Sequence, residues 1–153
     1  MRTPPIRRDT RRERTHPTRR TRACPLPLWR TRGPSAITAA EVRVLADAIS
    51  ATAILHEPRW PAARAGDSAA AAAVAIDRIH RQGPEGPLAD LVMGNLVVLA
   101  RRDGDATARV ILAHALRSLA RRYPGRTDLH RIADGWAGRH GGACRRVASG
   151  GRR

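Results

Sequence analysis

Apolar residues recur at every third or fourth position through the middle two thirds of the chain, a period that predicts α-helices rather than strands. The stretch from Thr38 to Glu41 fits a capping box, and Ile37 and Val42 stand where a hydrophobic staple would close around it. A first helix is therefore predicted over about 39–56. Its inward face should hold Val42, Val44, Leu45, Ala48, Ile49, Ala51 and Leu55.

Two further helices have clear start and stop residues. Asp67 or Ser68 begins the second, which passes through an alanine run and ends at Gly83. The third runs from Pro87 to about Arg102 and is apolar around most of its circumference, so we predict that it is the central helix. The inward face of the second helix should hold Ala69, Ala72, Ala73, Ile76 and Ile79.

The remaining helical signals complete the predicted fold. A fourth helix should run from a cap at Asp105 to about Arg122, and a short fifth helix should be capped by Thr127 or Asp128. These segments predict an all-α fold over residues 35–138, a small bundle of four main helices plus one short C-terminal helix.

The two ends of the chain differ in composition from the middle. Residues 1–34 contain six prolines among repeated Arg and Thr, and residues 139–153 are rich in Gly and Arg. Both have little to bury, so we expect them to be disordered basic tails. The abrupt change at residue 35 leaves a second interpretation of residues 1–34 open, a leader translated from a start site placed too far upstream.

Charge follows the same division. All 29 basic residues of this 153-residue chain are Arg, and the formal net charge is +16. Residues 1–32 contribute +9, residues 33–138 only +2, and residues 139–153 the other +5. The ends rather than the helical domain therefore carry the charge that a polyanionic partner would meet.

The N-terminal tail could bind phosphate backbones without sequence preference. Its candidate nucleic-acid contacts are Arg7, Arg8, Arg11, Arg12, Arg14, Arg19, Arg20 and Arg22. A sharper alternative is a helix-turn-helix made by the fourth and fifth helices, with Thr127, His130 and Arg131 toward a groove. Asp128 and Asp134 weigh against it, because they place negative charge on the same short helix.

Residue types that carry catalytic or metal chemistry are scattered. His80, His114 and His130 have no carboxylate or second His at metal-ligand spacing, and the chain has no Walker loop. Ser118 follows His114 by one turn, without an orienting acid or a glycine-rich oxyanion loop at a predictable spacing. We therefore expect no metal, no cofactor and no enzymatic activity.

Hydropathy and cysteine usage predict the cellular compartment of the protein. No stretch approaches the roughly eighteen apolar residues of a membrane span, and the N-terminus lacks the apolar core of a secretory signal. Cys24 and Cys144 lie one in each tail, without the local pairing of a zinc or redox motif. We expect a cytoplasmic protein with reduced thiols and no membrane partner.

Three side chains stand out as buried or contact positions. Asn95 falls in the middle of the apolar face of the third helix, where a buried amide would bond a neighbouring helix and fix its register. His80 borders the apolar face of the second helix, where we expect a buried capping group. Trp60, flanked by prolines, is expected to fold back as a lid over one end of the bundle, and the alternative is an exposed interface anchor.

The leading hypothesis is a non-catalytic protein-interaction or regulatory domain, which binds an unknown protein partner or a second copy of itself. The alternative is a nucleic-acid-associated protein that binds phosphate backbones through its Arg-rich tails. The two differ in salt dependence, because a tail-driven complex should weaken steeply as salt rises.

Overall fold

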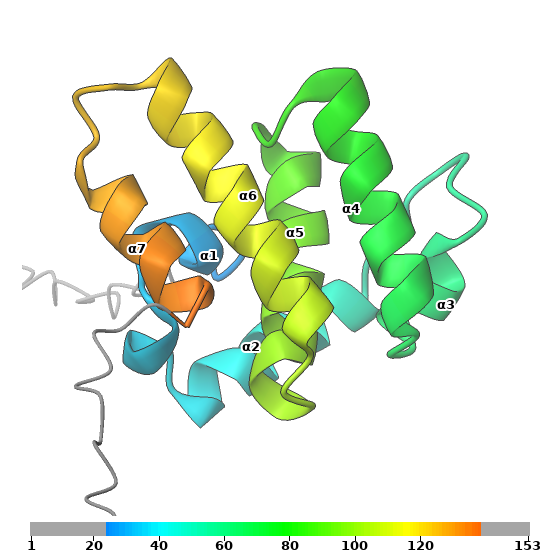
Figure 1. Ribbon diagram of the computed structural model, residues 1–153. Helices are drawn as coiled ribbons and strands as arrows, with labels where there is room; N and C mark the ends of the chain where they lie inside the picture. Colours follow the sequence, from blue (N-terminus) through cyan, green and yellow to red (C-terminus); the bar gives the residue numbers. More distant parts are fainter. Residues whose placement is uncertain (1–23, 139–153) are drawn as a thin grey trace, which may run out of the picture.

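The part of the chain that the structure describes is helical. The computed structural model describes residues 24–138, which hold no strand and no helix of the length and hydropathy needed to cross a bilayer. The predicted all-α class is therefore confirmed. In chain order the elements, drawn in Figure 1, are α1 (Leu28–Thr31), the 3-10 turn η1 (Pro34–Ala36), α2 (Ala39–Ser50), α3 (Trp60–Arg64), α4 (Ser68–Gln82), α5 (Pro87–Arg102), α6 (Ala106–Arg122) and α7 (Asp128–Trp136).

Side-chain caps fix the starts of α2, α4 and α6 where the sequence predicts them. Thr38 Oγ1 accepts from the backbone N–H of Glu41 at 3.2 Å, and the Glu41 carboxylate accepts from the backbone N–H of Thr38 at 2.9 Å. Asp67 and Asp105 each accept from a backbone N–H in the first turn of α4 and α6, both at 2.9 Å. These caps satisfy N–H groups that a helix start leaves unpaired, so local sequence is enough to place them.

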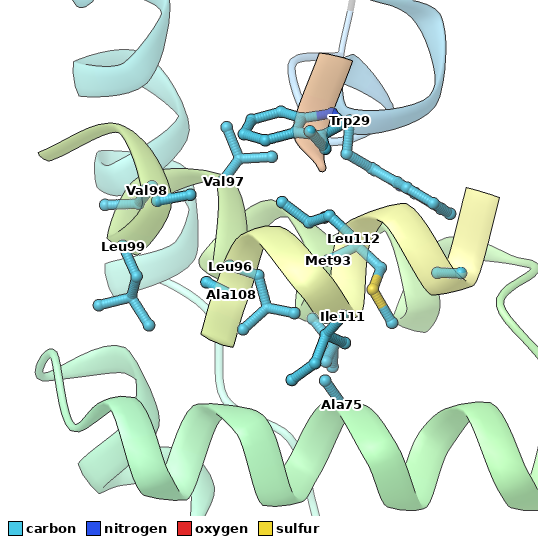
Figure 2. Close-up of a cluster of buried hydrophobic side chains, with 14 of the residues drawn as sticks. Trp29, Ala75, Met93, Leu96, Val97, Val98, Leu99, Ala108, Ile111 and Leu112 are labelled. Atoms are coloured by element: carbon cyan, nitrogen blue, oxygen red, sulfur yellow. The ribbon is translucent and has the colours of Figure 1, made fainter. Parts of the chain in front are cut away.

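The helix α5 is central, as its sequence predicts. Every residue from Ala89 to Ala100 is buried, and α5 packs against α1, α2, α4 and α6. Figure 2 shows Leu96 and Met93 of α5 among the buried side chains, close to Ile111 of α6. A helix that is apolar on all sides can be stable in water only when other elements cover it completely.

The glycine in the middle of α5 permits one of these contacts. A Cβ atom at Gly94 would lie 3.1 Å from Leu45 Cδ1 and 3.7 Å from Ile49 Cδ1, both on α2. The missing side chain therefore lets α2 approach α5 closely, as expected for a glycine at this position.

The first predicted helix ends earlier than expected, at Ser50 instead of residue 56. Thr52 Oγ1 donates to the carbonyl of Ala48 at 2.8 Å, and the carbonyl of Thr52 accepts from Trp60 Nε1 at 2.9 Å. These bonds hold the chain in a turn that competes with further helix. Two members of the predicted inward face, Ala51 and Leu55, lie beyond this end and are exposed, Leu55 by 82%. A third, Val44, lies within α2 and is 45% exposed.

The inward face predicted for α4 is correct in part, because Ala72 and Ile79 pack against the core whereas Ala69 and Ile76 do not. Its buried residues are Ala71, Val74 and Ala75, whereas the predicted Ala69 is exposed and Ile76 is 44% exposed. The helix is apolar on two sides, so its periodicity does not select which side meets the core. Its contacts with α3 and α5 make that selection.

The predicted boundary at residue 35 is also wrong. The indole of Trp29 on α1 is fully buried, and its Nε1 donates to Asp90 Oδ1 on α5 at 2.9 Å. Arg30 donates to the same carboxylate through Nε at 2.8 Å and Nη2 at 2.7 Å. Composition misses this segment because its few apolar residues pack against other helices and not against one another.

The change in composition that motivated a leader is therefore not a boundary of the fold. Residues 24–34 belong to the packed domain, since α1 contacts α5 and α7. The rest of the predicted N-terminal tail, residues 1–23, and the predicted C-terminal tail, residues 139–153, lie outside the described residues.

The Asp90 contacts predict a specific loss of stability. In Asp90→Ala the Trp29 N–H loses its buried acceptor and Arg30 loses its counter-ion, so the free energy of unfolding should fall by about 3 kcal/mol. The matched control is Asp47→Ala on the exposed side of α2, which should change it by less than about 0.5 kcal/mol. Urea denaturation of both variants checks this, and equal effects would contradict the anchoring role of Asp90.

Candidate functional site

The surface between α4 and α6 is hollowed into an open groove of about 300 Å³. We refer to it as the α4–α6 groove, and its lining residues are Ile76, Ile79, His80, Val110, Ile111 and His114. Ile76 is 44% exposed and Val110 is 65% exposed. Two large aliphatic side chains thus share one patch of surface above the core.

The two helices that form the groove run in the same direction. Ser68 Oγ donates to the Asp105 carboxylate, which joins the starts of α4 and α6. At the other end, Arg122 Nη1 on α6 lies 3.4 Å from Glu85 Oε2 in the loop that follows α4. Figure 1 shows α4 and α6 beside α5, which runs opposite to both.

The polar side chains that line the groove are two exposed imidazoles. His80 lies in the last turn of α4, and His114 lies at the middle of α6. The N-cap carboxylate of Asp105 lies outside the groove, at the start of α6. Hydrogen bonds from Ser68 Oγ and then from the backbone N–H of Ala108 lower the pKa of Asp105.

The lining of the groove carries no carboxylate and no guanidinium. Four of its six residues are aliphatic and the other two are histidines. On α6 the arginines nearest Val110 are bound elsewhere: Arg109 Nη2 donates to the carbonyl of Gly104 at 3.0 Å, and Arg117 Nη2 to Asp134 Oδ1 at 3.0 Å. An exposed aliphatic patch without charge is a feature of interaction surfaces.

Asn95, His80 and Trp60, the three positions that the sequence highlights, lie in different environments in the structure. Asn95 is buried, as predicted, and its Nδ2 donates to the carbonyl of Ala63 at 3.0 Å, so it holds α3 against α5. His80 is exposed, which corrects the prediction that it is buried, because the side of α4 that carries it faces solvent. Trp60 is only 2% exposed, so its surface cannot anchor a partner.

The helices of the helix-turn-helix alternative, α6 and α7, pack against each other, and His130 and Arg131 are exposed on α7. No three His, Cys, Asp or Glu side chains of residues 24–138 come together as a metal site would need. On the predicted helix-turn-helix, Asp128 takes two hydrogen bonds from Arg126, at 2.8 and 2.7 Å, which pairs this arginine within the protein. The eight candidate tail arginines lie outside residues 24–138.

Sequence reasoning did not identify the groove as a site. The sequence feature that could have indicated it is that α4 is apolar on two sides. Packing against a single core requires only one apolar side. The same reasoning missed Asp90, because a carboxylate in a first helical turn is ordinary and its partners come from 60 residues away.

Comparison with known proteins gives no relative. No protein-family model, no curated protein and no solved structure matches this chain. The function is therefore argued from the geometry of the groove.

Proposed function

We propose that this chain is a small helical bundle that serves as a non-catalytic protein-interaction or regulatory domain, with the α4–α6 groove as its binding face. The observation that carries the proposal is the exposure of Ile76 and Val110 in one groove whose lining holds no carboxylate or guanidinium. Burying a side chain of this size contributes about 1.5–3 kcal/mol, so covering both would supply useful binding energy.

The polar groups that line the groove are the exposed imidazoles of His80 and His114. The hydroxyl of Ser68 is occupied as a donor to Asp105. These side chains suit the polar rim of an interface, where they would fix orientation.

Site-specific photo-crosslinking in cells tests the proposal. A benzoylphenylalanine at position 110, in the groove, should give a crosslinked product in the cells that make the protein. The same group at position 43, on an exposed part of α2, should give none, because that position lies outside the groove. No product from position 110, or equal yields at both positions, would contradict the groove as a binding face.

A second candidate function rests on the charge distribution, a nucleic-acid-associated protein that binds through its ends. Residues 24–138 hold 15 of the 29 arginines and 11 of the 13 acids, so the remaining residues hold 14 arginines against two acids. Such a concentration of cationic side chains favours phosphate backbones.

Binding of the full chain to duplex DNA and to RNA, each at low and at physiological salt, tests this second function. Replacing the eight arginines Arg7, Arg8, Arg11, Arg12, Arg14, Arg19, Arg20 and Arg22 by Gln should remove most of the affinity and flatten the salt dependence. Replacing Arg43, Arg102 and Arg121, three exposed arginines of the helical domain, by Gln is the control and should have a small effect. Affinity that survives the tail replacements would contradict this function.

A further inference from the structure

We propose that this chain binds a small phosphate dianion, either inorganic phosphate or a short phosphomonoester, in a cavity that α5, α6, α7 and η1 line together. The cavity has a volume of about 210 Å³, and we refer to it as the arginine cavity. Its lining includes Arg101 of α5, Arg109 of α6, Trp136 of α7 and Pro34 of η1. It shares no lining residue with the α4–α6 groove, so this inference goes beyond the proposed function and does not depend on it.

Both guanidinium groups of the arginine cavity are held by the backbone. Arg101 Nη2 donates to the carbonyl of Ile37 at 3.1 Å, and Arg109 Nη2 donates to the carbonyl of Gly104 at 3.0 Å. A guanidinium has five N–H donors, so one such bond orients the group and leaves further donors for a ligand. An oriented guanidinium loses less conformational entropy when it binds an oxyanion than a freely rotating side chain does.

The positive charge of the arginine cavity has no counter-ion among the described residues. Within residues 24–138, no Asp or Glu lines the cavity, and the ion pairs are made by other arginines. The carboxylate of Asp105, one turn before Arg109, accepts from Ser68 Oγ and from the backbone N–H of Ala108 instead. Residues 139–153, which follow α7 in the chain, contain five Arg and no acidic side chain. This distribution of charge favours an anion taken up from solution.

The helix ends around the cavity change its charge only slightly. The last turns of α5 and α7 carry partial negative charge, and the first turn of α6 carries partial positive charge. Each end is equivalent to about half a unit charge, so the three together amount to about half a negative charge. With two guanidinium groups the cavity remains positive by about 1.5 unit charges.

Trp136 adds a hydrogen-bond donor that has no acceptor. Its side chain is 1% exposed, and its Nε1 is buried without a partner among residues 24–138. The other two indoles are paired, Trp29 with Asp90 and Trp60 with the carbonyl of Thr52. A buried N–H group without an acceptor is rare in proteins because it is unfavourable. A small rotation of the Trp136 ring toward the cavity would bring this N–H to a ligand oxygen.

The size and charge of the cavity select the ligand. Ordinary ligand pockets enclose about 300–1,000 Å³, so the arginine cavity takes only a small molecule. A carboxylate, or one phosphodiester of a nucleic acid, carries a single negative charge and would leave one guanidinium uncompensated. A phosphomonoester carries about −1.5 to −2 charges at pH 7 and has three acceptor oxygens. These match two guanidinium groups and one indole N–H.

Proton–nitrogen NMR of the full chain at constant ionic strength tests the site, because the indole N–H of Trp136 reports on the cavity alone. Titration with inorganic phosphate, at a mildly alkaline pH where it is a dianion, should shift this signal with a dissociation constant in the millimolar range, as expected for so small a ligand. The indole signals of Trp29 and Trp60 should stay in place, since both have acceptors inside the protein. The variant Trp136→Phe identifies the signal by its loss.

Arg101→Gln and Arg109→Gln should each weaken phosphate binding about tenfold, because each removes charge-assisted hydrogen bonds. The control is Arg43→Gln with Arg121→Gln, two exposed arginines outside the cavity, which should change the dissociation constant by less than about twofold. All four arginines are exposed, so the variants should fold, and circular dichroism verifies that they do.

The outcomes separate the site from its ligand. A Trp136 signal that phosphate does not move, or moves equally in wild type and in both cavity variants, would overturn the site. Acetate, or duplex DNA without terminal phosphates, that shifts the Trp136 signal as strongly as inorganic phosphate would overturn the choice of a phosphate dianion. Glycerol 3-phosphate distinguishes the two sources of the dianion. A shift equal to that of inorganic phosphate supports a phosphomonoester, and no shift supports free phosphate.

Discussion

A helix that is apolar around its whole circumference has to be covered on every side, and this constraint on α5 organises the rest of the structure. The buried run from Ala89 to Ala100 includes two polar side chains, Asp90 and Asn95. Each needs a partner in the dry interior, because an unpaired buried polar group costs about 1–3 kcal/mol. Trp29 and Arg30 supply partners for Asp90, and the carbonyl of Ala63 supplies one for Asn95.

These polar contacts explain why short segments with weak helical signals are part of the fold. The helix α1 has four residues and α3 has five, lengths at which an isolated helix is not stable in water. Both are held by a buried Trp and by a hydrogen bond to or from a polar group on α5. The covering of α5 therefore stabilises them, and they in turn close the core.

The same constraint leaves the α4–α6 groove open. The helices α4 and α6 each turn one apolar face toward α5, and each has a second apolar position on the outer side, Ile76 and Val110. Nothing in the described part of the chain covers that outer side. The surface that remains is the basis of the proposed binding face.

The sequence predicts helix starts that are set by residues next to them in the chain. It does not predict helix ends or buried faces that depend on contacts with other helices. Caps at Thr38, Asp67 and Asp105 place three helix starts, because each cap bonds only its own first turn. The early end of α2 depends on Trp60, and the inward face of α4 depends on its neighbours, so neither can be derived from periodicity. Burial of Asn95 follows from its place between leucines, whereas His80 borders the face and could lie on either side.

Apolar surface is sealed around α5 and left open at the α4–α6 groove. Methyl NMR of dilute protein with a soluble gadolinium agent tests it directly, because the agent broadens methyl groups in proportion to their access to solvent. We expect the methyls of Leu96 and Val97 to remain sharp while those of Ile76 and Val110 broaden strongly. Strong broadening of Leu96 and Val97, or sharp Ile76 and Val110 methyls in the dilute monomer, would contradict it.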